Sequence, residues 1–210
     1  PWVEAPVGQQ VTKLVPPTGY VAAMRARAHA AVGPWRAPAG AIAVPRFIVG
    51  VEVEFPRAIG DELNDANVSV IRTVAGNVRL YGWRSLSTDL ENYTHLIGAD
   101  VVNTVANLAE LVLEPHVFKP IDGKGMLYAS VQADLIGILE PMRAAGGLYE
   151  RTAEDGTQVD PGYSVDVGAT VNTIAVQQSN TVAAVIALRV SPVGELIDVT
   201  IVKAALGATV

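Results

Sequence analysis

The sequence predicts an α+β fold in which a mixed sheet packs against two long helices. Two segments, 96–113 and 126–145, carry apolar residues at helical spacing. Two shorter segments, 68–74 and 78–83, are rich in β-branched residues and flank Ala75-Gly76-Asn77, which indicates a hairpin with a tight turn. Because extended and helical segments occur along the whole chain, α+β is the class that fits.

The first third of the chain is expected to contain one helix and two short elements. Residues 1–17 hold four prolines and predict an extended entry. Thr18 is the expected N-cap of a helix that runs to Val32 and ends at Gly33-Pro34. Residues 46–54 alternate as in a strand, and 61–66 predict a short acidic helix. The buried stripe of the first helix is expected at Val21, Met24, Ala28 and Val32.

The second half is expected to hold the two long helices and then strands. Pro115 and Pro120 follow the first long helix, and Pro141 is expected to kink the second. Residues 152–162 predict a charged loop, and 163–167, 182–191 and 196–204 predict strands. The near-continuous apolar character of the last two indicates burial on both faces. The apolar stripes of the two helices are Val101, Val105, Leu108 and Val112, then Leu127, Val131, Leu135, Ile138 and Met142.

Composition favours a chain that buries surface against other protein. Of 210 residues, 50% are hydrophobic and 17% are charged, below the ~25% usual for soluble domains. The net charge is −6 without a cluster of Lys and Arg, which argues against a nucleic-acid partner. The absence of cysteine excludes disulfides and thiolate catalysis. The most apolar stretch, 181–193, is shorter than a membrane span and contains Arg189, so no membrane insertion is expected.

No pattern in the chain matches a metal or phosphate site. The three histidines, His29, His95 and His116, include no pair at the helical spacing of a zinc motif. Lys124 lies between two glycines but lacks the earlier glycine and the following Ser or Thr of a phosphate loop. We therefore expect neither a metal nor a cofactor.

Two arrangements leave an enzyme open as an alternative. Ser87 and Asp89 could form a triad with His95 or His116, although no serine lies in a Gly-x-Ser-x-Gly elbow. Glu52 and Glu54 share one face of the expected strand at 46–54 and could act as a glycosidase-like carboxylate pair. Such a pair is more often the solvated face of an edge strand or a charged contact surface. No catalytic residue is expected.

The most distinctive local segments fix backbone shape, and neither contains a nucleophile. Residues 16–22 read PPTGYVA and residues 33–39 read GPWRAPA. These resemble the "PPSG-x-VAG" and "G-x-W-K-A-P-A-N" elements of contractile tail sheath proteins, the myovirus-type tail sheath family. Residues 67–72 resemble "N-x-I-R" and 78–86 resemble "I-R-V-W-G-A-R-T-L".

The resemblance continues in order along the chain. Residues 114–120 resemble "V-F-E-P-N", 146–148 resemble "G-A-L", and 189–197 resemble "V-A-P-V-x-P-A-E-F-I". Gly40 replaces the usual Asn, Lys119 an acidic residue and Ala75 a Pro. The matched positions are Pro16, Pro17, Gly19, Trp35, Ala37, Pro38, Arg72, Gly82, Arg84, Phe118, Pro120 and Pro192.

The resemblance implies a structural subunit that polymerises helically around an inner tube and contracts to drive the tube through the host envelope. Implied partners are other copies of the chain, a tail tube protein, and baseplate and tail terminator proteins. The implied location is a virion tail that is assembled in the host cytoplasm. The chain is expected to be the C-terminal portion of such a protein, with the end of the middle domain at 1–90 and the conserved C-terminal domain with its arm at 91–210.

The resemblance also implies exchange of a terminal strand between subunits, which would add to the edge of a neighbour's sheet. The alternative is an ordinary strand in the chain's own sheet. For the whole chain, the alternatives are another virion shell component, such as a capsid or baseplate protein, or a hydrolase with scattered carboxylates. The residues expected to exchange are Asp198, Val199, Thr200, Ile201, Val202 and Lys203.

Overall fold

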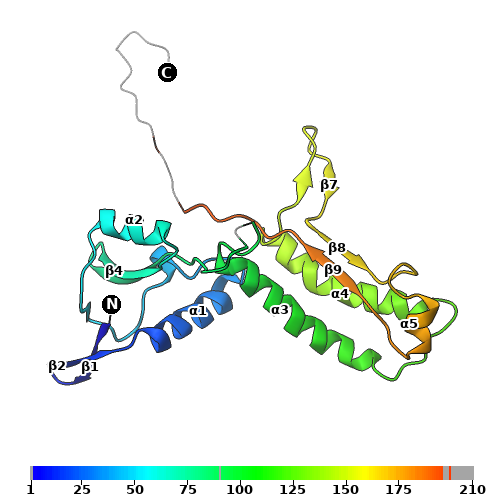
Figure 1. The fold of residues 1–210 in the computed structure, drawn as a ribbon, viewed down its shortest axis with the longest axis horizontal. Helices are drawn as coiled ribbons and strands as arrows, with labels where there is room; N and C mark the ends of the chain where they lie inside the picture. The colour runs from blue at the N-terminus through cyan, green and yellow to red at the C-terminus, as the bar shows by residue number, and fades with distance from the viewer. Residues whose placement is uncertain (1, 90, 196–198, 200–210) are drawn as a thin grey trace, which may run out of the picture.

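The computed structural model describes residues 2–89, 91–195 and 199. Helices and strands occur throughout, so the α+β class is confirmed. The expected mixed sheet is replaced by four small antiparallel sheets, each built mainly from strands adjacent in sequence. Figure 1 shows an elongated molecule with small sheets beside α1 at one end and the two long helices at the other.

The chain opens with a hairpin that the prolines did not predict. Strands β1 (Val3–Gly8) and β2 (Val11–Val15) pair, and β3 (Gly50–Val51) pairs with the start of β1. The strand expected at 46–54 is therefore only two residues long. Pro6 is tolerated inside β1 because β3 reaches only Val3 and Glu4, which leaves one side of β1 unpaired at Pro6.

Helix α1 (Thr18–Val32) ends as expected, before Gly33, whose φ is 104°. Its N-cap is Pro17, and no side chain caps it, so the assignment of Thr18 as N-cap was wrong. The helix already begins at Thr18 because Pro17 has helical backbone angles. After the short turn η1 (Gly40–Ile42), helix α2 (Arg57–Asp65) starts earlier than expected, directly after Pro56.

The hairpin of β4 (Val70–Val74) and β5 (Asn77–Tyr81) is confirmed. Val74 pairs with Asn77, and both residues between them have positive φ, 50° at Ala75 and 76° at Gly76. Such a two-residue turn twists in the same sense as the strands.

The two long helices are confirmed with almost the expected bounds. They are α3 (Leu96–Leu113), which continues into η2 (Glu114–His116), and α4 (Met126–Ala144). Val101 and Val105 are buried on α3, as are Leu127 and Leu135 on α4. Pro141 lies within α4 near its end.

Two hairpins and a short helix complete the described chain. They are β6 (Arg151–Thr152) with β7 (Gln158–Asp160), α5 (Ile174–Gln178), and β8 (Tyr163–Asp166) with β9 (Val185–Leu188). The charged loop expected at 152–162 is thus a hairpin. Burial of β9 on both faces was wrong, because its residues alternate between exposed and half-buried and only one face packs on the core. The strand expected at 196–204 lies outside the described residues, apart from Val199.

One hydrophobic core crosses residue 90. Met24 of α1, Leu80 of β5, Ile97 of α3 and Leu139 of α4 belong to the same buried cluster. A smaller cluster around Val131 and Val167 lies between α4 and β8–β9. The division into 1–90 and 91–210 stays a prediction.

One helix among the described residues is long and apolar enough to cross a membrane, Leu96–His116, with 21 residues and a mean hydropathy of 1.5. This corrects the expectation that 181–193 is the most apolar long segment. Core helices of soluble proteins pass the same test, and Ile97, Val101 and Val105 of this helix are buried in the core.

Candidate functional site

Trp35 joins two elements that are far apart in the sequence. A Cβ placed on Gly33 would lie 2.4 Å from the Trp35 ring, and one on Gly147 would lie 2.6 Å from it. The indole therefore packs directly on the backbone after α1 and on the backbone after α4. Gly33 and Gly147 are both required by this close approach, and Gly33, with φ 104°, also ends α1.

A buried carboxylate binds α1, α3 and the segment after β5 together. Asp100 of α3 is 4% exposed, and it accepts hydrogen bonds from Trp83 Nε1 (2.9 Å) and from the guanidinium of Arg25. His29 Nε2 lies 3.4 Å from Asp100 Oδ2. Burial lowers the pKa of His29 by more than the nearby Asp100 raises it. His29 is therefore neutral at pH 7, and its contact with Asp100 is then not an ion pair.

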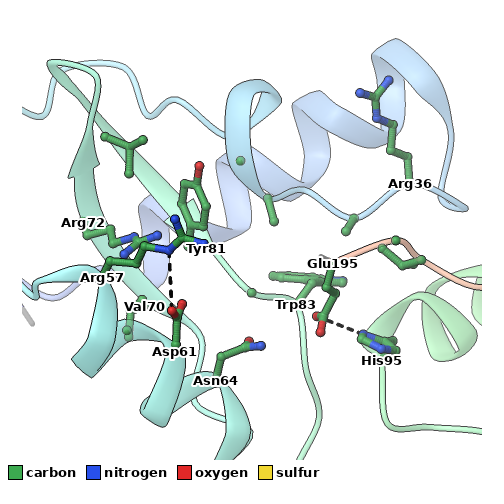
Figure 2. Close-up of a pocket in the computed structure, with 18 residues that line it drawn as sticks. Arg36, Arg57, Asp61, Asn64, Val70, Arg72, Tyr81, Trp83, His95 and Glu195 are labelled. Atoms are coloured by element: carbon green, nitrogen blue, oxygen red, sulfur yellow. Dashed lines mark ion pairs between the residues drawn. The ribbon is translucent and has the colours of Figure 1, made fainter. Parts of the chain in front are cut away.

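An ion-pair cluster fixes Glu195, and Figure 2 shows the His95–Glu195 pair of this cluster. Arg84 donates to Glu195 Oε2 from Nη2 at 2.6 Å and from Nε at 3.1 Å, and His95 Nδ1 lies 3.5 Å from Glu195 Oε1. Partial burial opposes ionisation of Glu195, but the hydrogen bonds from Arg84 and the neighbouring positive charges lower its pKa overall. The carboxylate is ionised at neutral pH and anchors the chain at this point.

A cavity of about 660 Å³ opens beside this cluster, between α2, the β4–β5 hairpin and residues 193–195. The Arg72 guanidinium lies 4.5 Å from the centre of the Tyr81 ring. Arg57 of α2 pairs with Asp61 at 3.7 Å. Figure 2 shows the Arg57–Asp61 pair, and both Arg57 and Arg72 line the cavity.

The sheet of β8 and β9 has one open edge. The backbone N–H of Arg189 donates to the Gly162 carbonyl, and the Arg189 carbonyl accepts from the N–H of Tyr149. The N–H of Ser191 donates to the Gly147 carbonyl. This side of β9 and of the residues after it is therefore paired. Backbone groups alternate between the two sides of a strand. The N–H and C=O groups of Ile186, Leu188 and Val190 therefore face the other side, where no strand of the described chain pairs.

The outer edge of β8 is partly occupied. Gln132 of α4 donates to the carbonyl of Val165 at 3.2 Å. The open side of β9 is therefore the edge at which a further strand can add.

The sequence-predicted motif positions lie at separate places. Trp35 packs on the backbone that follows α1 and α4, and Arg84 binds Glu195. Gly82, with φ 94°, packs against Asn64 and Ser69. Phe118 is fully exposed with φ 66° after α3. The remaining positions are Pro16 and Pro17 before α1, Gly19 within it, Ala37 and the buried Pro38 after it, Arg72 in the cavity, and the exposed Pro120 and Pro192.

The residues considered for catalysis are engaged in separate local contacts. Ser87 Oγ accepts from the backbone of Asp89, while His116 contacts Asp134. Glu54 binds Thr73, and Glu52 accepts from the backbone of Trp2. Within the part of the chain that the structure describes, no group of three or more His, Asp or Glu side chains could hold a metal.

Two important partners were missed from sequence. Asp100 is the one acidic residue in the first half of the apolar 96–113 segment, which is a signal for a buried, paired carboxylate. Glu195 was assigned to a motif, but its pairing with Arg84 across 111 positions left no local pattern.

The fold is that of chains in contractile injection systems. A chain of the anti-feeding prophage (AFP) baseplate superposes with a TM-score of 0.79 at 21% identity, over 98% of this chain and 53% of that one. A chain of the contracted PVC sheath complex, from an extracellular contractile injection system, gives 0.79 at 20% identity over 97% and 54%. A chain of the contracted AFP helical sheath gives 0.76 at 21% identity over 97% and 54%.

This chain therefore spans about half the length of the solved structures that it resembles. No protein-family model matches it, and no curated protein matches it. At this level of identity the likeness establishes the fold.

Proposed function

We propose that this chain is part of a structural subunit of a contractile sheath. The subunit polymerises helically around an inner tube and contracts to drive the tube through an envelope. The observation that carries the proposal is the likeness over 97% or more of the chain to components of two contractile systems, one of them a helical sheath. The ordered motifs of the sheath family, in the same chain, support it independently.

The partners in this proposal are other copies of the chain, a tail tube protein, a baseplate and a tail terminator. Assembly takes place in the host cytoplasm, and the finished location is a tail or tail-like particle, of phage type by the motif resemblance. The proposed role is structural and not enzymatic. In support, the residues considered for catalysis make separate local contacts and do not come together in one site. The N-terminal part, 1–90, belongs to a middle domain and 91–210 to the C-terminal domain.

Strand exchange between copies is the mechanism of assembly that we propose. The six residues 198–203 add to the open edge of β9 in a neighbour, where Ile186, Leu188 and Val190 present unpaired backbone groups. Main-chain hydrogen bonds supply affinity, and the alternating side chains set the register.

The course of the chain after β9 favours exchange over pairing within one copy. Beyond Val190 the chain runs away from β9 towards residue 195 (Figure 1). There the Glu195 carboxylate is bound by Arg84. Only two residues separate this anchor from Asp198. A strand on the chain's own β9 edge would have to begin within three residues of this anchor.

Deletion of 199–210 tests the proposal. We expect the truncated protein to keep its circular dichroism spectrum and its cooperative unfolding, because the buried residues of the two described hydrophobic clusters all precede residue 196. We expect it to form no helical tubes in electron micrographs. Tubes formed as readily as by the complete protein would contradict strand exchange.

A baseplate component is the second candidate, because the likeness to a chain of the AFP baseplate is as strong as that to a sheath. The same electron micrographs distinguish the two roles. A sheath subunit forms long sleeves of stacked rings, whereas a baseplate component stops at a closed ring.

A further inference from the structure

Arg84 and His95 form a clamp on the Glu195 carboxylate. The two residues face each other in an isolated antiparallel bridge between the segment after β5 and the residue before α3. Backbone hydrogen bonds of 2.9 and 3.0 Å between their neighbours flank the bridge on both sides. Residues opposed in this way hold their side chains close together on one face. The fold therefore presents a guanidinium and an imidazole together, before Glu195 reaches them.

The clamp holds Glu195 through directional contacts. Arg84 donates to Oε2 from Nε and Nη2, and His95 Nδ1 lies 3.5 Å from Oε1, the side that Figure 2 shows. The three side chains are between 22% and 29% exposed, so the contact is less screened by water than a surface ion pair. Val193, two residues earlier, packs on the main hydrophobic core. The chain is thus fixed at both 193 and 195.

The place of the clamp along the chain decides which edge the run 198–203 can reach. If the chain reversed directly after Glu195, with 196–197 as a two-residue turn, the run would lie opposite 190–195. It would then cover only Val190 among the open groups of β9. A strand that also covers Ile186 and Leu188 has to begin beside Val190, and 191–197 then form the connection.

Glu195 lies inside that connection, so the clamp restricts it. With Glu195 bound, the chain runs away from β9 to Arg84 (Figure 1) and has to return to Val190 within three residue steps. Three steps span about 10 Å at full extension. With Glu195 released, the residues after Val193 are free to turn, and closing a loop of this length costs little more than closing a shorter one. The clamp therefore opposes pairing within one copy and does not oppose pairing with a neighbour.

We propose that Arg84 and His95 are positioning residues for strand exchange. By holding Glu195 they prevent the run 198–203 from pairing with β9 of its own copy and leave it for β9 of a second copy. This inference rests on the proposed assembly, and it explains why the β9 edge of an unassembled subunit stays open. The same rule governs domain swapping, in which a hinge that cannot fold back passes its element to a neighbour.

Release of the clamp tests the proposal in the complete protein. Glu195→Arg places like charges together at Arg84, so we expect the run to fold back onto its own β9. A closed form that holds about nine subunits in ten raises the concentration for half-maximal tube formation about tenfold. The same population slows hydrogen exchange of the Ile186, Leu188 and Val190 amides about tenfold in the unassembled subunit.

Two further readouts distinguish this role from a merely structural one. The thermal unfolding temperature of Glu195→Arg should be unchanged or higher, because its own sheet gains a strand, whereas loss of a structural ion pair would lower it. Deletion of 199–210 in the same variant should abolish the slow exchange of the three amides. That result would identify the protecting segment as the terminal run.

The controls separate the clamp from ion pairs in general. The double variant Arg84→Glu with Glu195→Arg restores opposite charges and should recover most of the assembly and the fast amide exchange. Glu150→Gln removes a carboxylate that Arg143 binds at 3.0 Å, away from the clamp. It should change both readouts less than about threefold.

A longer connection tests the geometry with the clamp intact. A Gly/Ser segment of about six residues, inserted between Glu195 and Leu196, extends the return from the clamp to about 30 Å. We expect the same slow exchange of the β9 amides and the same loss of tube formation as in Glu195→Arg. A contact between Glu195 and a neighbouring copy would not produce this protection in the unassembled subunit.

Three results would overturn the role of the clamp. One is a Glu195→Arg subunit whose β9 amides exchange as fast as in the wild type, and another is a double variant without recovery. The third is faster exchange of these amides when 199–210 are deleted from the wild-type subunit, because the run would then already cover its own β9. If the wild type forms no tubes, the proposed function fails, and the exchange measurement still decides whether the clamp controls the run.

Discussion

Trp35 shows what a single motif residue contributes. The sequence marked it because it follows a helix end and matches a sheath motif, and the structure places its ring between Gly33 and Gly147. Its value lies in bringing the ends of α1 and α4 together. A larger residue at either glycine would separate them.

Gly147→Ala should destabilise the fold by about 1–3 kcal/mol, because its Cβ would overlap the Trp35 ring at 2.6 Å. The matched control is Gly137→Ala in α4, where a Cβ meets open space and removal of a helical glycine stabilises by up to about 1 kcal/mol. Urea denaturation measures both. Equal effects of the two variants would rule out the close packing of Trp35.

His29 makes stability depend on pH. Burial lowers its pKa in the folded protein below 6.5, so the unfolded chain binds the proton more readily. The contribution of neutral His29 to the free energy of unfolding is complete above about pH 6.5, the ordinary pKa of histidine. This contribution is lost as the pH falls through that value towards the lower pKa of the folded protein. We expect His29→Gln to flatten the fall in unfolding free energy between neutral pH and pH 5, measured by urea denaturation. An unchanged slope would refute this assignment.

Single residues were predictable where their signal is local. Gly76, in its turn, and the helix-ending Gly33 have backbone requirements that neighbouring residues reveal. The partners of Asp100 and Glu195 were not predictable from the sequence, because Arg25 and Arg84 lie 75 and 111 positions away from them along the chain. Such pairs depend on the tertiary fold.

At the scale of elements, long periodic segments were the most predictable. Helices α3 and α4 were found within a residue of their ends because their apolar stripes extend over several turns. The β1–β2 hairpin was missed because prolines suggested an irregular entry and its turn uses Gln10 at φ 61°. The β6–β7 hairpin could have been found from Asp155-Gly156, a strong hairpin signal.

The terminal strand allows a sharper test than its deletion. Ile201→Pro removes one backbone donor from the middle of the run 198–203. We expect it to reduce tube formation at least tenfold without changing the thermal unfolding of the subunit. Ile201→Val keeps the donor and the branched side chain, and should assemble nearly as well as the wild type. Assembly of the proline variant at wild-type levels would show that 201 takes no part in a ladder.

At the scale of the whole molecule, the surface suits an assembled state. The end of the α3–α4 pair exposes large apolar side chains, including Leu111, Phe118 and Met126. The low charged fraction predicted burial against other protein, but which faces remain apolar depends on how the helices pack. The α+β class followed from the periodicity of the segments, whereas the resemblance to sheath proteins followed from the order of the motifs.

The most direct test of the central claim is cryo-electron microscopy of the purified complete protein under assembly conditions. The proposal predicts hollow helical sleeves in which residues 198–203 of one subunit form a strand on the open edge of β9 in another. Closed shells, single rings or dispersed monomers would contradict it, as would sleeves in which that edge stays unpaired.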